Sequence, residues 1–124
     1  MLSRFARLLF AAAVSFQMSA PAFAHHSVAM FDTQKQLTLS GTVRVFQFSN
    51  PHCFIQLLVP NGSELVEWNI EMASPAHLIR NGWNRNTIKA GDKLIISINP
   101  ARAGGNDGRF LSATRDGTPI GAQP

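Results

Sequence analysis

Two stretches of alternating residues on either side of a turn sequence constrain the fold of this chain most strongly. Pro60-Asn61-Gly62-Ser63 has the composition of a tight turn, in which Gly accepts positive φ and Asn forms local hydrogen bonds. Residues 52–59 and 64–71 alternate between apolar and polar side chains, which is typical of half-buried strands. The pattern predicts an antiparallel hairpin with one face toward a core and one toward solvent.

A simple hairpin in which Val59 faces Glu64 gives a predicted register for the two strands. The expected apolar-face pairs are Leu57–Val66, Ile55–Trp68 and Cys53–Ile70, and the polar-face pairs are Gln56–Glu67, Phe54–Asn69 and His52–Glu71. Each face is internally consistent, and a slip of one residue would exchange the two faces. This register assigns Trp68 to the core and places His52 opposite Glu71.

Three further strands and one helix are predicted around this hairpin. Residues 37–48 alternate with Gly41 as an expected bulge, and residues 93–99 and 109–114 form the last two strands. Ser74 before Pro75 is typical of a helix start and Asn81-Gly82 of a helix stop, so residues 75–81 are expected to be helical. Three strands, a short helix and two more strands are the element order of an OB-fold. The expected fold class is therefore mainly β, a small five-stranded OB-like barrel, and an open sandwich of the same strands is the alternative.

The chain divides into four predicted segments. Residues 1–24 have the features of a signal peptide, because Arg4 and Arg7 precede an apolar run and Ala22-Phe23-Ala24 matches a cleavage site. Residues 25–36 form an extended N-terminal arm, residues 37–115 the OB-like barrel and residues 116–124 a flexible tail. The mature chain has no apolar run near the roughly 20 residues that a membrane helix needs. We therefore expect a periplasmic protein without a transmembrane segment.

Charge and cysteine content limit the classes of protein to consider. Of the 11 basic residues, Arg4 and Arg7 belong to the signal peptide, which leaves nine basic against seven acidic residues. The positive charges are scattered, whereas a nucleic-acid binder carries a clustered basic patch. The single cysteine, Cys53, cannot form an internal disulfide, and a buried free cysteine usually behaves as a small apolar residue. No nucleic-acid partner is expected, and stability must come from packing.

A series of short motifs covers almost the whole mature chain. They are Ala24-His25-His26-Ser27, Phe31-Asp32, Leu39-Ser40-Gly41-Thr42-Val43, Asn50-Pro51-His52, Trp68, Ser74-Pro75, Leu78, Arg80-Asn81-Gly82-Trp83 and Lys89-Ala90-Gly91-Asp92. Together they resemble DUF6152, a family of small exported bacterial proteins of unknown function, and the Asn-Pro-His and Gly-Trp pieces are the most specific. The resemblance implies the fold and the export but no activity. Cys53 departs from it, because an apolar residue is expected after His52.

Three histidines form a candidate metal site. Cleavage of the signal peptide would free the amine of His25, and an amine combined with imidazole nitrogens suits Cu(II). His26 and His52 are candidates for the remaining ligand, and Glu71 is expected to orient the His52 ring as a second-shell carboxylate. The arrangement resembles the histidine brace of copper-dependent polysaccharide oxidases, of which only His25 carries over by position. The alternative is a solvated N-terminus, with His52 hydrogen-bonding to its neighbours at the start of a strand.

A second candidate site is the outward face of the barrel. In the predicted strands, Arg44, Phe46, Phe48 and Phe54 lie on this face together with His52. OB-folds bind oligonucleotides and oligosaccharides across such a face, where aromatic rings stack on bases or sugars. In the periplasm, an envelope protein or a glycan is the expected partner. The alternative is that the three phenylalanines pack beneath the arm or the helix as a minor core.

The sequence contains no nucleophile triad, cofactor fingerprint or zinc-protease motif. Adjacent His52 and Cys53 would point to opposite faces of a strand, so they do not form a nucleophile and base. His77 is expected on the surface and Trp83 at one end of the barrel. The predicted function is that of a periplasmic binding module, not an enzyme, that binds copper at the mature N-terminus. An envelope interaction or structural protein without metal is the alternative, and copper-dependent redox chemistry is a third.

Overall fold

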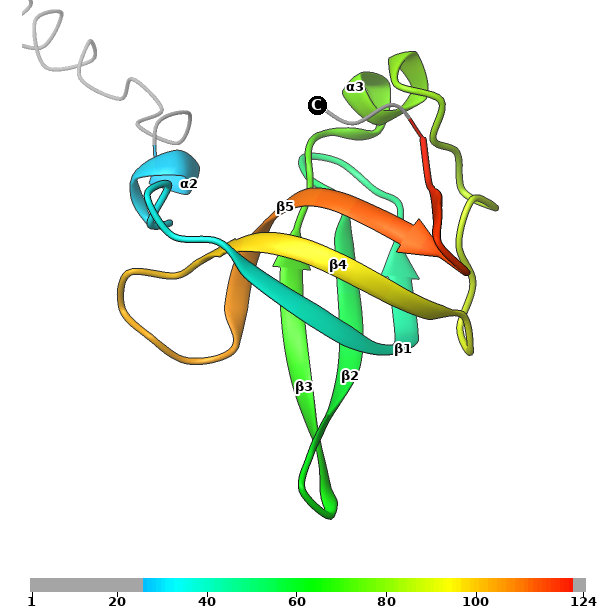
Figure 1. The fold of residues 1–124 in the computed structure, drawn as a ribbon. Helices are drawn as coiled ribbons and strands as arrows, with labels where there is room; N and C mark the ends of the chain where they lie inside the picture. Colours follow the sequence, from blue (N-terminus) through cyan, green and yellow to red (C-terminus); the bar gives the residue numbers. More distant parts are fainter. Residues whose placement is uncertain (1–25, 122–124) are drawn as a thin grey trace, which may run out of the picture.

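The computed structural model describes residues 26–121 of the 124-residue chain (Figure 1). Its elements are α2 (His26–Ala29), β1 (Leu37–Gln47), β2 (Phe54–Asn61), β3 (Glu64–Glu71), α3 (Pro75–Arg80), β4 (Lys93–Pro100), β5 (Asp107–Arg115) and β6 (Thr118–Pro119). No helix in this part of the chain is long and apolar enough to cross a membrane. The predicted signal peptide and His25 lie outside the described residues.

The strands form one sheet that closes on itself. The antiparallel order is β3-β2-β1-β4-β5-β6, and β3 also pairs in parallel with β5. This last pairing, between Asn69–Glu71 of β3 and Asp107–Arg109 of β5, joins the two ends of a five-stranded sheet into a barrel. The rest of β3 extends beyond the closure with the β2–β3 hairpin. The predicted mainly β, OB-like barrel with one short helix between the third and fourth strands is confirmed.

The register of the β2–β3 hairpin differs from the predicted one by two residues. Leu57 lies opposite Trp68 and Ile55 opposite Ile70, because the turn contains only two residues and Asn61 pairs with Glu64. Gly62 takes a φ of 63° at the first position of this turn, as a two-residue type II′ hairpin requires. A shift of two residues leaves every side chain on its predicted face. The predicted faces of the two strands are therefore correct, and the predicted residue pairs are wrong.

The bulge in β1 lies at Arg44, not at the predicted Gly41. The pairing with β2 skips a residue between Val43 and Val45, which reverses the facing of the side chains beyond that point. Val43 is buried, Val45 is exposed and Phe46 turns toward the core. Gly41 has a different role, because a Cβ there would lie 2.5 Å from the carbonyl oxygen of Leu58. Its hydrogen therefore permits the close approach of β1 to β2.

The core fills the barrel and extends to its α3 end. Its fully buried aliphatic side chains are Val43, Ile55, Leu57, Ile70, Ile88, Leu94, Ile96 and Ile98. Trp83, only 2% exposed, packs with Phe110 at 5.5 Å between ring centroids and with Phe46 at 6.2 Å. Trp83 therefore lies at one end of the core, as predicted, whereas Trp68 is only partly buried and packs against the core.

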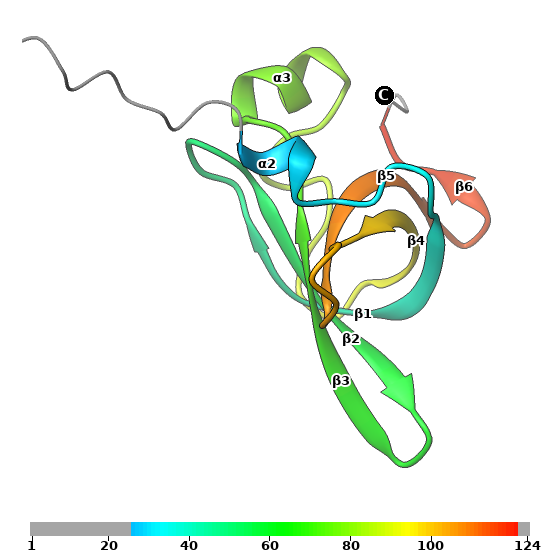
Figure 2. The same ribbon diagram turned by 90° about the vertical axis from the view of Figure 1, so that its left-hand side faces the viewer.

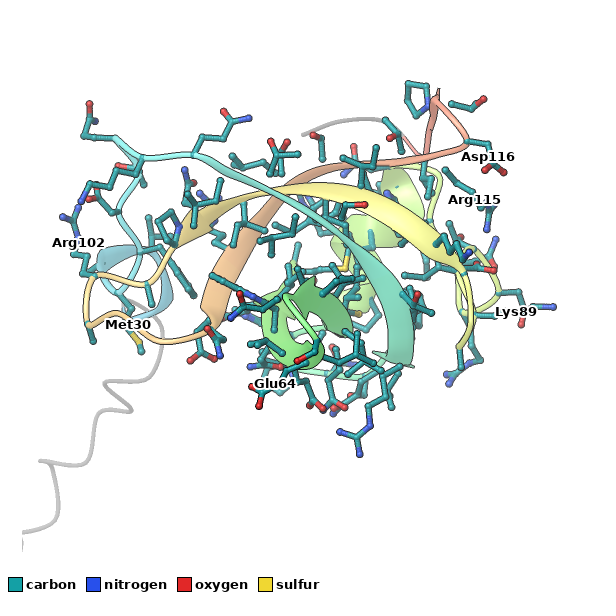
Figure 3. The ribbon with its side chains drawn as sticks, turned by 60° about the horizontal axis from the view of Figure 1, so that its bottom comes forward. Met30, Glu64, Lys89, Arg102, Arg115 and Asp116 are labelled. Atoms are coloured by element: carbon teal, nitrogen blue, oxygen red, sulfur yellow. The ribbon has the colours of Figure 1, made fainter. Side chains whose placement is uncertain are left out.

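The N-terminal arm is not extended throughout, because it contains the short helix α2. After this helix, Phe31 is buried and forms a bridge with Ala101, and the Asp32 amide donates to the carbonyl of Pro100 at 2.8 Å. Met30 and Arg102 lie on the same side of the molecule (Figure 3), where the Arg102 amide donates to the Met30 carbonyl at 2.8 Å. The arm is thus fastened to the end of β4.

The predicted flexible tail over residues 116–124 contains the short strand β6. Thr118 and Pro119 pair with the end of β5, and Ile120 is buried against the core. Asp116 and Gly117 both take positive φ, which allows the chain to reverse between the two strands. The part of this tail up to Ile120 is therefore ordered by backbone pairing and by burial of one apolar side chain, contrary to the prediction.

Candidate functional site

A pocket of about 340 Å³ lies at the end of the barrel where α2 and α3 are found. Figure 2 shows both helices on the side of the barrel away from the tip of the β2–β3 hairpin. Four parts of the chain line the pocket: α2, the segment before β2, the end of β3 with α3, and β5. The side chains that the site uses are Val28, His52, Glu71, Met72, Ser74, His77, Leu78, Trp83, Arg109 and Phe110.

His52 and Glu71 form the central polar contact of this pocket. The imidazole Nδ1 of His52 lies in short contact with Oε1 of Glu71, although Glu71 is paired in the ladder with Phe54. Both side chains remain partly accessible, at 37% for His52 and 20% for Glu71. When Nδ1 donates its hydrogen to the carboxylate, the neutral ring keeps a lone pair on Nε2. The predicted meeting of these two residues is therefore present, with one imidazole nitrogen left for a ligand.

His77 lies on another wall of the pocket because α3 begins immediately after β3. Ser74 has extended backbone angles and its Oγ accepts a hydrogen bond from the His77 amide at 3.4 Å, which starts the helix. Leu78 is buried and anchors α3 to the core, while the neighbouring His77 is exposed. His77 is on the surface, as predicted, but it lines the same pocket as His52. Sequence spacing contains no signal for that proximity.

Arg109 is the pocket residue that sequence reasoning missed. The parallel pairing of β3 with β5 makes Arg109 the neighbour of Glu71. Glu71 is in contact with His52, and no described residue forms an ion pair or side-chain hydrogen bond with the Arg109 guanidinium. The next residue, Phe110, faces inward and is buried in the core. Arg109 therefore brings to the pocket a guanidinium that has no ion-pair partner among the described residues.

Of the two predicted N-terminal ligands, the described residues include only the backbone of His26. The helix α2 begins at His26, and Val28 lines the pocket together with His52. His25 lies outside the described residues. Among the residues whose side chains are described, no three His, Cys, Asp or Glu side chains gather as a metal-binding group. The pocket thus supplies His52 and His77 as imidazoles, and Val28 of α2 forms part of its wall.

The predicted outward aromatic face is not formed as expected. Phe46 and Phe48 pack against the core and contact each other edge to face, with 5.7 Å between ring centroids. Arg44 forms an ion pair with Glu67, and Phe54 is half-buried. The bulge at Arg44 explains the difference, because it turns Phe46 and Phe48 away from the face that Arg44 occupies. The packing of these two rings agrees with the alternative of a minor core.

Cys53 lies behind the pocket on the buried side of β2. Its side chain is fully buried, and its backbone pairs with Met72 and Ala73 beyond the end of the β2–β3 ladder. Desolvation by burial raises the pKa of the Cys53 thiol, and a hydrogen bond from the backbone of Ser49 and the charge of Arg85 oppose this only in part. A neutral, buried thiol is neither a nucleophile nor a metal ligand, so Cys53 serves as a packing residue.

Comparisons with known proteins give one match. A family model described as "Family of unknown function (DUF6152)" matches residues 13–110, which is most of the chain. No curated protein and no solved structure matches.

Proposed function

The chain belongs to the DUF6152 family, whose function is unknown, and we propose that it is an exported, periplasmic binding module for a copper-type metal ion. The contact between His52 and Glu71, both of which line the pocket, is the observation that carries the proposal. Metal-binding histidines in proteins commonly donate their second ring nitrogen to a carboxylate, which fixes the tautomer and orients the ring. His52 has this arrangement before any metal is bound.

The remaining ligands are proposed at the mature N-terminus. Cleavage after Ala24 would give His25 a free amine, three residues before Val28 in the wall of the pocket. His25 would then contribute its amine and its ring, with His26 or His77 as the further imidazole. Nitrogen donors of this kind favour Cu(II) over harder cations such as Mg²⁺ or Ca²⁺.

The alternative function, an envelope protein or glycan partner on the aromatic face, has less support. It requires Phe46 and Phe48 to stand on the outer face beside Arg44, and both rings pack inward. Among the predicted aromatic residues, Phe54 alone has its predicted orientation beside His52 on the outer side. We propose no catalytic role, because the pocket residues form no nucleophile–base pair.

The test is a Cu(II) titration of protein that has been exported and processed in cells, with the N-terminus checked by mass spectrometry. The expected result is one copper per chain with a nitrogen-rich EPR spectrum, and its loss when one residue is added before His25. Replacing His52 with Ala should weaken binding strongly and change the nitrogen hyperfine pattern. Acidification should release the metal, because protons compete for the amine and imidazole nitrogens.

Glu71→Gln is the sharper variant, because it keeps the size of the side chain and removes the charge that orients His52. We expect copper affinity to fall about 10- to 100-fold, as for other second-shell carboxylates. Glu67→Gln is the matched control, since Glu67 is on the same strand but pairs with Arg44 outside the pocket. Equal copper affinity in wild type, Glu71→Gln and His52→Ala would contradict a site built on the pocket.

A further inference from the structure

We infer that the pocket also binds a small carboxylate with an apolar body, and that Arg109 holds the carboxylate group. This inference goes beyond the metal proposal and does not depend on it, since Arg109 and the apolar floor take no part in the proposed metal site. It rests on the charge of Arg109, on the apolar floor beside it and on the size of the cavity.

The charge argument compares Arg109 with the three described arginines that have a carboxylate partner. Arg44, Arg102 and Arg115 each lie within 4 Å of a carboxylate, on Glu67, Asp32 and Asp92 respectively. Arg109 has a carboxylate as its strand neighbour, but Glu71 is turned to His52. Its five N–H donors are therefore unpaired among the described residues. A guanidinium at the mouth of a pocket pairs well with a planar carboxylate, which it can bind through two parallel hydrogen bonds.

The apolar floor of the pocket is the reason for expecting a ligand with an apolar body. Met72, Leu78, Trp83 and Phe110 are all buried core residues, and each also lines the pocket. Ligand pockets typically have volumes of about 300 to 1,000 Å³, so this cavity suits a molecule at the small end of that range. An apolar chain or ring placed on this floor would bury apolar surface away from water, which favours binding. A simple anion such as acetate has little such surface to bury.

The surrounding polar groups favour a monoanion over a phosphate. The carboxylate of Glu71 lies next to Arg109 in the sheet, and it would repel a dianion more strongly than a single negative charge. At the start of α3, Ser74 accepts a hydrogen bond from the His77 amide, so its hydroxyl hydrogen is available to a carboxylate oxygen. The imidazole of His77 has no described partner and is a further donor on α3.

The experiment uses the processed protein in EDTA, so that a metal plays no part, and titrates three probes. Hexanoate has both the charge and the apolar body, acetate lacks the body, and hexanamide lacks the charge. We expect hexanoate to bind more tightly than either and to shift the amide NMR signals of residues 71–78 and 109–110. Acetate and hexanamide binding as tightly as hexanoate would overturn the inference, as would hexanoate shifts confined to other residues.

Variants at Arg109 test the role of the guanidinium. Arg109→Gln should weaken hexanoate binding about tenfold or more, the scale expected for loss of hydrogen bonds to a charged group, and Arg109→Lys should lose less. Arg80→Gln is the control, because Arg80 is an exposed arginine on α3 that does not line the pocket. Equal loss in Arg80→Gln and Arg109→Gln would show a general charge effect and overturn the assignment. Should Arg109→Gln fail to fold, the comparison of the three probes on wild type still decides the case.

Discussion

Two charged regions of this molecule differ in whether their arginine side chain has a hydrogen-bond or ion-pair partner. In the loop before β4, Asp92 accepts a hydrogen bond from Arg115 at 2.8 Å and another from the Lys89 amide at 3.0 Å. Arg115 also donates to the carbonyl of Thr87 at 3.3 Å. At the pocket, the side chains of Arg109 and His77 have no such partners among the described residues. The labelled Lys89 and Arg115 lie close together on one side of the barrel (Figure 3).

The two regions therefore differ in whether their charged side chains are paired within the fold. The Asp92 region satisfies its own donors and acceptors, and it ties residues 87–92 to the end of β5. The pocket leaves donors unpaired where a cavity adjoins them, and such unpaired groups are available to a ligand. Removing a charge should therefore change stability in the first region and binding in the second.

The largest expected change in the free energy of unfolding is at Trp83, and measuring it tests whether the pocket floor is part of the folded core. Trp83→Ala removes a buried ring that packs on Phe46 and Phe110 and also lines the pocket. We expect it to lower the free energy of unfolding by about 3–5 kcal/mol, as typical for a buried Trp changed to Ala. Urea denaturation followed by circular dichroism measures this, and Trp68→Ala, at a partly buried position, should cost less. A loss below about 1 kcal/mol for Trp83→Ala would mean that the pocket floor is not core.

A smaller effect should distinguish the two charged regions directly. Asp92→Asn removes the ion pair with Arg115 and weakens the bond from the Lys89 amide, which should cost about 0.5–1.5 kcal/mol. Arg109→Gln should change the free energy of unfolding by less than about 0.5 kcal/mol, because no described contact is lost. The same urea titrations check both variants. A larger loss of unfolding free energy for Arg109→Gln than for Asp92→Asn would contradict this distinction, since Arg109 would then stabilise the fold.

Sequence reasoning predicted the elements well because their signals are local. Alternation located all five barrel strands, and the Ser74-Pro75 start with the Asn81-Gly82 stop located α3 to within one residue. The strand order followed from the element order. The hairpin register was wrong, because the composition of residues 60–63 indicates a turn but not whether two or four residues form it.

The pocket was harder to predict because it depends on contacts between distant parts of the chain. The facing of His52 and Glu71 could be expected from the hairpin, since an error of two residues preserves the face. Arg109 could not, because only the parallel closure of β3 on β5 places it beside Glu71. The bulge at Arg44 likewise has no signal of its own in the alternating pattern, so Phe46 and Phe48 were assigned to the wrong side.

The smallest expected effect concerns the buried side of the pocket region, where Cys53 lies directly after His52. Burial raises the pKa of the Cys53 thiol in the folded protein above its value in the unfolded chain. The folded state thus disfavours the thiolate, so the contribution of Cys53 to stability is complete below the unfolded pKa and declines as pH rises through it. The difference in unfolding free energy between wild type and Cys53→Ala should be constant from about pH 6 to 8 and fall above about pH 8.5. Urea titrations of both proteins across this range measure it, and subtracting the variant removes the titration of all other groups. A difference that grows with pH would mean that the thiolate is stabilised in the fold, and Cys53 would then be more than a packing residue.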